Sequence, residues 1–220
     1  MPLVDPRPAI RPRAVATGRP ASDPGCAGCG QLGTFRALRR AGFEVQGGLG
    51  CDPRVGRRWT PASGRWAAVA GGQHFARAGA SQLLDAVARS GASLLIVGDI
   101  ETPGRAARIA AQLEAAGATV AMVSPSDLGA MEAAVARAAE ARGRAAVVAL
   151  APCVRGATGR PAVVVTGSRC NRCGACLGLA CPALRDRGGE AMVVDPRVCA
   201  GCDLCTALCR SRAIGPAAPP

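Results

Sequence analysis

Residues 170–181 read CNRCGACLGLAC and residues 199–209 read CAGCDLCTALC, so eight of the twelve cysteines crowd into the last quarter of this 220-residue chain. Each stretch has three cysteines at intervals of three and a fourth cysteine after a longer gap. Three thiolates at this spacing wrap a short loop around one iron–sulfur cubane, and with two clusters the fourth cysteine of each run ligates the other cluster. The spacing therefore predicts two [4Fe–4S] clusters, one on Cys170, Cys173, Cys176 and Cys209 and one on Cys199, Cys202, Cys205 and Cys181.

Zinc is the alternative for these eight cysteines, because it also binds thiolates. Zinc sites usually join two separated C-x2-C pairs around one tetrahedral ion, which would leave the third cysteine of each run surplus. Nothing in this part of the sequence offers a base or a nucleophile, so we expect it to move electrons rather than to catalyse bond chemistry. We predict that residues 161–220 form a small α+β, ferredoxin-like domain with two clusters.

Upstream of the cysteine runs, residues 25–160 alternate apolar segments with helical patterns. The sequence predicts strands at 66–70, 93–97, 119–123 and 145–150 and helices at 32–41, 80–90, 105–116 and 127–142. This alternation is typical of an α/β domain, a mostly parallel sheet with helices on both faces. Ser126 or Asp127 is expected to cap the last helix, and Gly91, Gly117 and Gly143 stand where helix C-terminal glycines belong. Residues 1–24 are rich in proline and lack periodicity, so we expect a disordered or docking arm.

Composition excludes several classes of protein. The net charge is +12, but every basic residue is arginine and only 2% of the residues are aromatic. A single-stranded nucleic-acid site would interleave basic and aromatic side chains, so we expect no nucleic-acid partner. No apolar run approaches the ~20 residues of a membrane helix, and the first residues lack the apolar core of a signal peptide. Cysteine-rich chains in a reducing compartment more often bind metals than form disulfides, so we expect a cytoplasmic protein outside the membrane.

The four remaining cysteines lie in short motifs. Residues 24–30 read PGCAGCG, residues 33–38 GTFRAL, residues 48–51 GLGC and residues 151–153 APC. With the two-cluster tail, over roughly residues 24–215, these motifs resemble the thiamine-diphosphate half of 2-oxoacid:ferredoxin oxidoreductases, in particular the C-terminal part of the indolepyruvate ferredoxin oxidoreductase alpha subunit. The resemblance implies a thiamine-diphosphate-binding-like α/β fold and a third [4Fe–4S] cluster on Cys26, Cys29, Cys51 and Cys153. Buried structural thiols are the alternative for these four cysteines.

The same resemblance implies a site for thiamine diphosphate with Mg²⁺, and here the sequence departs from the family. The family holds the metal through an Asp in a G-D-S or G-D-G motif and an Asn after the next strand. Gly72, in Gly71-Gly72, stands at the Asp position and has no oxygen ligand for a hard cation, whereas Asp99 offers one carboxylate. Gly71, Gly72 and Asp99 are therefore the candidate cofactor residues of a weakened or absent site. We assign no catalytic residue, because the single histidine, His74, is more simply a polar surface residue.

Three functions remain open. The first is an iron–sulfur electron-transfer subunit of an indolepyruvate or 2-oxoacid:ferredoxin oxidoreductase-like complex, which relays electrons to ferredoxin. The second is a catalytically competent thiamine-diphosphate subunit that oxidatively decarboxylates an aryl 2-oxoacid, so whether the chain is itself an enzyme stays open. The third is a redox-sensing ferredoxin fusion. The first two require a complementary oxidoreductase subunit for the half of the family enzyme that this chain lacks, and ferredoxin or a similar carrier as electron acceptor.

Overall fold

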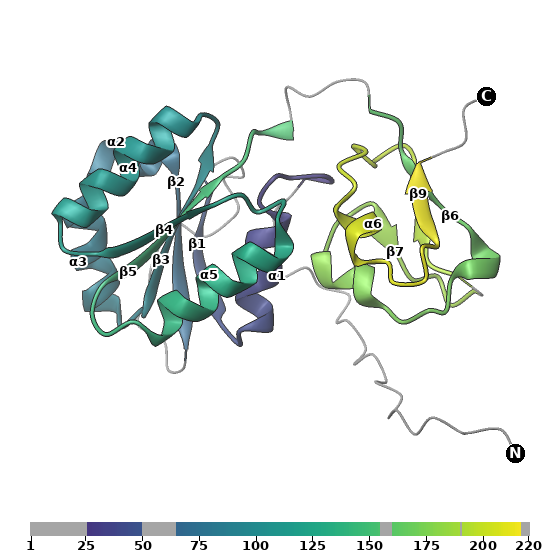
Figure 1. The fold of residues 1–220 in the computed structure, drawn as a ribbon, viewed down its shortest axis with the longest axis horizontal. Helices are drawn as coiled ribbons and strands as arrows, with labels where there is room; N and C mark the ends of the chain where they lie inside the picture. The colour runs from purple at the N-terminus through teal and green to yellow at the C-terminus, as the bar shows by residue number, and fades with distance from the viewer. Residues whose placement is uncertain (1–25, 50–64, 155–159, 190, 217–220) are drawn as a thin grey trace, which may run out of the picture.

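The computed structural model describes residues 26–49, 65–154, 160–189 and 191–216 (Figure 1). These residues form a part with a parallel sheet and helices, here called the α/β domain, and a part with small antiparallel strand pairs and the two cysteine runs, here called the smaller domain. The boundary expected at residues 160 and 161 stays a prediction. The expected arm at 1–24 and Cys51 lie outside the described residues.

The larger domain is built on a five-stranded parallel sheet. Its strands are β1 (Glu44–Gly48), β2 (Trp66–Gly71), β3 (Leu94–Ile100), β4 (Thr119–Val123) and β5 (Ala145–Leu150), in the order β1-β2-β3-β5-β4. The four predicted strands are confirmed. The sequence analysis missed β1, whose EVQGG sequence carries a charge and two glycines and is only partly buried because the strand lies at the sheet edge.

Helices cover both faces of this sheet, as the sequence predicted (Figure 1). One face carries α1 (Leu32–Arg40) and α5 (Leu128–Glu140), and the other carries α2 (Gly72–Ala78), α3 (Ala80–Ser90) and α4 (Pro103–Ala115). The short α2 was not predicted, because Gly72 begins it directly after β2. Asp127 rather than Ser126 caps α5, where its carboxylate accepts a hydrogen bond of 2.9 Å from the amide of Ala130.

Alternate residues of each strand face opposite layers of the core. In β2, Trp66, Ala68 and Ala70 pack under α2, α3 and α4, whereas Ala67 and Val69 pack under α1 and α5. All five side chains are almost fully buried, so the strand reads as a continuous apolar run. Because most of these side chains are small, the helices lie close to the sheet.

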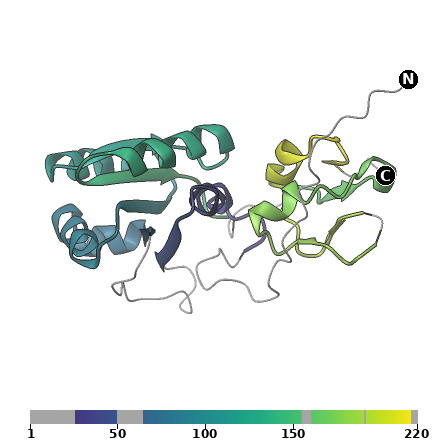
Figure 2. The same ribbon diagram turned by 90° about the horizontal axis from the view of Figure 1, so that it is seen from below.

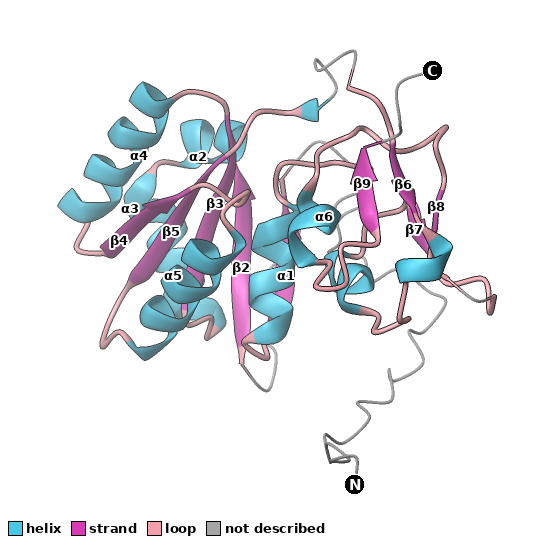
Figure 3. Ribbon diagram, turned by 45° about the vertical axis from the view of Figure 1, so that its right-hand side comes forward, coloured by secondary structure: helices cyan, strands magenta, loops and turns pink. Residues whose placement is uncertain are grey.

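The smaller domain contains two antiparallel strand pairs and short helices (Figure 3). The pairs are β6 (Val163–Val165) with β9 (Ile214–Pro216) and β7 (Leu184–Arg185) with β8 (Val193–Val194). The 3₁₀ helices are η2 (Gly167–Arg169) and η3 (Ala175–Leu179), and α6 spans Leu204–Leu208. Among the residues the structure describes, no helix is long and apolar enough to span a membrane.

Helix α1 lies between the two domains (Figure 2). The guanidinium of Arg39 donates a hydrogen bond of 3.0 Å to the carbonyl oxygen of Gly178 in η3. At the other end of α1, Leu32 is fully buried in the core of the smaller domain. The helix therefore belongs to the cores of both domains and holds them together.

Replacing Gly33 by Ala tests the close packing of α1. A methyl group at Gly33 would collide with the carbonyl oxygen of Pro125 and lie 3.0 Å from a methyl carbon of Leu128. Overpacking of this kind costs about 1–3 kcal/mol, so we expect Gly33→Ala to lower Tm by at least about 2 °C in thermal unfolding followed by circular dichroism.

The matched control is Gly104→Ala. Gly104 is also the second residue of its helix, and nothing lies within 4 Å of a methyl group there. Since Ala favours a helix over Gly, we expect an unchanged or slightly higher Tm. Equal Tm values for the two variants would show that the approach of Pro125 to α1 is not tight.

Candidate functional site

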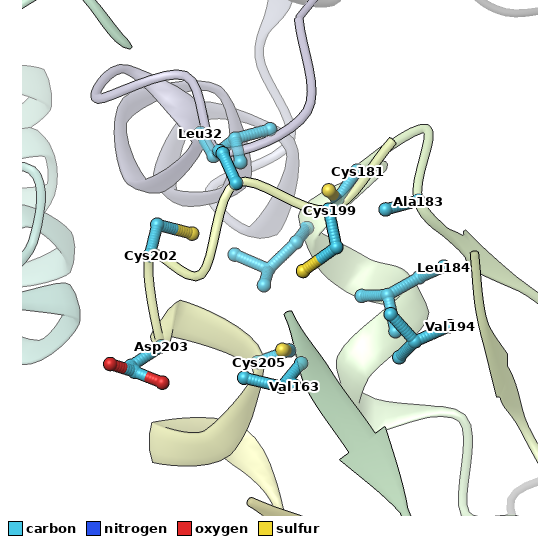
Figure 4. Close-up of a pocket in the computed structure, with 13 residues that line it drawn as sticks. Leu32, Val163, Cys181, Ala183, Leu184, Val194, Cys199, Cys202, Asp203 and Cys205 are labelled. Atoms are coloured by element: carbon cyan, nitrogen blue, oxygen red, sulfur yellow. The ribbon is translucent and has the colours of Figure 1, made fainter. Parts of the chain in front are cut away.

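The eight C-terminal cysteines gather around two cavities of similar size in the smaller domain. The inner cavity, about 340 Å³ including space open to solvent, is lined by Cys181, Cys199, Cys202 and Cys205, with their sulfur atoms around one space (Figure 4). The outer cavity, about 300 Å³, is lined by Cys170, Cys173, Cys176 and Cys209. The lining residues fall into the same two groups as the spacing, with Cys181 and Cys209 each in the cavity of the other run. That each group ligates a cluster stays a prediction.

The two cysteine runs follow the same backbone path. The residue before the second cysteine has a positive φ in both runs, 53° at Arg172 and 62° at Gly201, and so does the residue after it, 71° at Gly174 and 61° at Asp203. Residues other than glycine rarely adopt this left-handed conformation. Its use at Arg172 and Asp203 shows that surrounding contacts hold each loop in a tight curl around its cavity.

Burial makes three of these thiols reluctant to ionise. It raises the pKa of Cys176 to about 11 and that of Cys205 to about 12. Burial also raises the pKa of Cys202, and the neighbouring Cys181 and Cys199 thiols add to the effect. A thiolate is the form that binds metal. A cationic group in the cavity would therefore favour ionisation of these thiols, which the apolar surroundings oppose.

Cys209 differs from the other cysteines. Burial acts to raise its pKa, but hydrogen bonds from the Ser211 hydroxyl and from nearby backbone amides outweigh burial and lower the pKa overall. The amide of Ala213 donates to the Cys209 sulfur at 3.2 Å, and the amide of Gly201 donates to the Cys199 sulfur at 3.5 Å in the other loop. Amide hydrogen bonds to sulfur stabilise thiolates and influence the reduction potential of iron–sulfur clusters.

The chemistry of both cavities fits iron–sulfur clusters. Each offers four thiol side chains, an apolar lining and at least one backbone amide that donates to sulfur. None of the eleven cysteines that the structure describes forms a disulfide. Within the same residues, no three Cys, His, Asp or Glu side chains are arranged around a single metal ion.

The structure brings together the segments of three of the four cysteines assigned to a third cluster. Cys26 and Cys29 belong to one turn, in which the amide of Cys29 donates to the carbonyl oxygen of Cys26 at 3.3 Å. A methyl group on Gly30 would lie 2.7 Å from the Ala151 side chain, so this turn packs against the segment that leads into Cys153. Because Cys51 lies outside the described residues, the four-cysteine ligand set stays a prediction.

The same turn also packs against the inner cavity. Gly28 and Leu32 line this cavity beside its cysteines. A methyl group on Gly28 would lie 2.6 Å from the side chain of Ala200 and 3.6 Å from that of Cys202. The Cys26–Cys29 turn and the Cys199–Cys205 loop are therefore in direct contact across the domain boundary.

The candidate thiamine residues meet at the carboxyl edge of the sheet, but packed side chains fill the space beside them. Gly71 pairs with Gly98 in register, which brings Gly72 next to the backbone of Asp99. The carbonyl oxygen of Leu49 lies against Gly71. The side chain of Leu49 would lie 2.6 Å from a methyl group added to Gly98. The side chain of Asp99 lies outside the described residues.

Gln31 packs against the same edge beside Leu49. Its amide nitrogen donates to the carbonyl oxygen of Ala149 at 3.0 Å, and its amide oxygen accepts from the Thr34 hydroxyl at 2.8 Å. Gln31 and Leu49 are only 2% and 8% exposed. These described residues fit a packed sheet edge better than a diphosphate–metal site, and the assignment of Gly71, Gly72 and Asp99 to thiamine diphosphate stays a prediction.

Sequence reasoning missed the roles of Gln31 and Leu49, because Gln31 lies outside the motifs and Leu49 is the apolar residue of GLGC at residues 48–51. Both residues act through contacts with distant strands. His74 lies exposed on α2, as expected of a polar surface residue.

Comparison with known proteins supports one relationship. No model of a known protein family matches the chain, and no solved structure matches it. Over 98 residues, 43% of the chain, it is 39% identical to indolepyruvate oxidoreductase subunit IorA of Methanothermobacter thermautotrophicus. The chain resembles an indolepyruvate oxidoreductase subunit. This finding confirms the resemblance inferred from the motifs, while the matched part spans only 16% of the length of IorA.

The exchange of Cys181 and Cys209 predicts how iron is lost in double variants. Cys176 and Cys209 line the same cavity, so Cys176→Ala/Cys209→Ala should lose about four iron atoms, no more than either single variant. Cys176 and Cys181 line different cavities, so Cys176→Ala/Cys181→Ala should lose about eight. Iron and sulfide assays after anaerobic purification measure both losses, and far-UV circular dichroism checks each fold. The reverse result would mean that each run holds its own cluster.

The packed sheet edge predicts that thiamine diphosphate has no effect on stability. A ligand that binds only the native state and is present at about one hundred times its Kd would add about 2.7 kcal/mol to the free energy of unfolding. We expect millimolar thiamine diphosphate with Mg²⁺ to shift the Tm of the chain by less than about 1 °C. A thiamine-dependent decarboxylase serves as positive control, and a rise of about 5 °C or more would show that Leu49 and Gln31 give way to the cofactor.

Proposed function

We propose that this chain is an iron–sulfur electron-transfer subunit of an indolepyruvate or 2-oxoacid:ferredoxin oxidoreductase-like complex in the cytoplasm. It relays electrons through [4Fe–4S] clusters to ferredoxin. The observation that carries the proposal is the pair of four-cysteine cavities, one of which packs against the Cys26–Cys29 turn.

Two equal sets of ligands in neighbouring cavities suit a relay. A cubane cluster exchanges one electron at a time, and its potential responds to hydrogen bonds, charge and exposure. Here backbone amides donate to sulfur atoms in both cavities, among them Cys199 in the inner and Cys209 in the outer. The protein thus has the means to set the two potentials separately, which a directional relay needs.

The arrangement also supports an order for the relay. The inner cavity shares Gly28 and Leu32 with the α/β domain, next to the turn assigned to the third cluster. The outer cavity is lined only by residues of the smaller domain, and Cys173 on its wall is exposed. We therefore propose that electrons pass from the Cys26–Cys29 turn to the inner cavity, then to the outer cavity, and leave the chain beside Cys173.

The α/β domain serves this function as a scaffold. Leu49 and Gln31 pack the edge where the family holds its cofactor, and Gly72 replaces the metal-binding Asp. A complementary oxidoreductase subunit would therefore supply the reaction that produces the electrons. The similarity to IorA, a subunit by name, fits a role within a larger assembly.

Cofactor analysis of the anaerobically purified complex tests the proposal. We expect about twelve iron atoms and twelve sulfides for this chain and no thiamine diphosphate bound to it. Cys26→Ser should remove about four irons and leave the two C-terminal clusters intact, as judged by their electron paramagnetic resonance signals. Stoichiometric thiamine diphosphate on this chain would instead support the catalytic subunit, and unchanged iron in the Cys26 variant would exclude the third cluster.

Rapid mixing separates a relay from a redox sensor. Dithionite-reduced clusters of a relay should be reoxidised rapidly by an added small acceptor. Clusters that stay reduced in its presence would favour the sensor.

A further inference from the structure

Arginine residues adjoin the cysteines of the outer cavity in the chain, but not those of the inner cavity. Three of the outer cysteines have an arginine as direct neighbour in the chain, and Arg212 follows Ser211, which also lines the outer cavity. The four residues are Arg169, Arg172, Arg210 and Arg212, and all are exposed. No cysteine of the inner cavity has an adjacent arginine, and an exposed aspartate, Asp203, lines that cavity.

Three of these arginines keep their full charge available to a partner. The guanidinium of Arg172 donates to both carboxylate oxygens of Asp186 at 3.0 and 3.1 Å. Arg169, Arg210 and Arg212 form no ion pair with any acidic side chain that the structure describes. Their side chains therefore face solvent, and their chain neighbours Cys170, Cys209 and Ser211 line the same cavity as the exposed Cys173.

We propose that Arg169, Arg210 and Arg212 form a docking surface for an acidic electron-carrier protein, which receives electrons from the outer cavity. The proposal rests on the relay function proposed above and names the place and the charge of its exit. Thiolate ligands make the rim of a cluster negative, so an acidic carrier would be repelled without compensating cations. Exposed arginines beside the ligands reverse the local sign and steer the carrier toward the site.

A nucleic acid fits this surface less well. Residues 160–220 contain no Phe, Tyr or Trp, so no aromatic ring is available there to stack on bases. An electron carrier would benefit from binding beside an exposed cysteine ligand, because electron transfer needs a short path between redox centres.

A charge-reversal experiment tests the docking surface. In the anaerobic complex, Arg169→Glu/Arg210→Glu/Arg212→Glu is compared with Arg77→Glu/Arg89→Glu/Arg137→Glu. The second triple changes the net charge equally, and its residues are exposed on the α/β domain without ion pairs to described side chains. Stopped-flow absorbance measures the second-order rate of electron transfer from dithionite-reduced complex to a purified acidic ferredoxin and, separately, to a small neutral quinone.

We expect the first triple to slow transfer to ferredoxin at least about tenfold at low ionic strength. Added salt should slow the unaltered protein but not this variant, because salt screens attraction. The control triple should change the rate by less than about twofold at about 0.1 M salt, where a Debye length is only about 10 Å. Transfer to the quinone should be the same in all three proteins.

The opposite results separate two failures. An unchanged rate in the first triple, or an equal loss in the control triple, overturns the docking surface while quinone reduction still supports the relay. If the purified complex contains no clusters whose absorbance bleaches on reduction, the relay function is overturned, and the docking proposal falls with it.

Discussion

Cys181 belongs to the first cysteine run but lines the cavity formed by the second, and Cys209 belongs to the second run but lines the cavity formed by the first. Neither cavity is complete until the two runs have folded against each other, so the smaller domain assembles as one unit around its cysteines. The strand pairs are too short to stabilise a domain alone, and the buried core includes Cys176 and Cys205 among a few aliphatic side chains. A domain of this size usually needs a metal or disulfides in place of a large apolar core.

Small residues then join this domain to the parallel sheet. At Gly28 and Gly30, the Cys26–Cys29 turn approaches Ala200 on one side and Ala151 on the other so closely that added methyl groups would lie under 3 Å from their neighbours. Leu32, at the start of α1, completes the contact by filling the core of the smaller domain. The composition, 49% apolar but only 2% aromatic, suits this design, because backbones approach closely only where side chains are small.

The two ends of the structure have different chemical character. The carboxyl edge of the sheet is closed by Leu49 and by the hydrogen-bonded Gln31, which leaves packing where the resembling family has a cofactor. The smaller domain keeps every cysteine of its two runs and arranges them in cavities with amide donors to sulfur. This contrast between the two ends supports the proposed transfer of electrons over their generation.

The sequence by itself determined the elements whose signal is local or periodic. These were four of the five parallel strands, the helices on both faces, and the grouping of eight cysteines into two sets, because ligand spacing and alternating burial are written along the chain. Tertiary structure decided the rest. The edge strand β1 has a weak pattern and pairs only because β2 lies beside it, and the roles of Gln31 and Leu49 arise from contacts with Ala149, Gly71 and Gly98 across the sheet. The contact of Gly28 with Ala200 likewise joins residues far apart in the chain. Sequence spacing does not indicate which distant backbone segments will pack against each other.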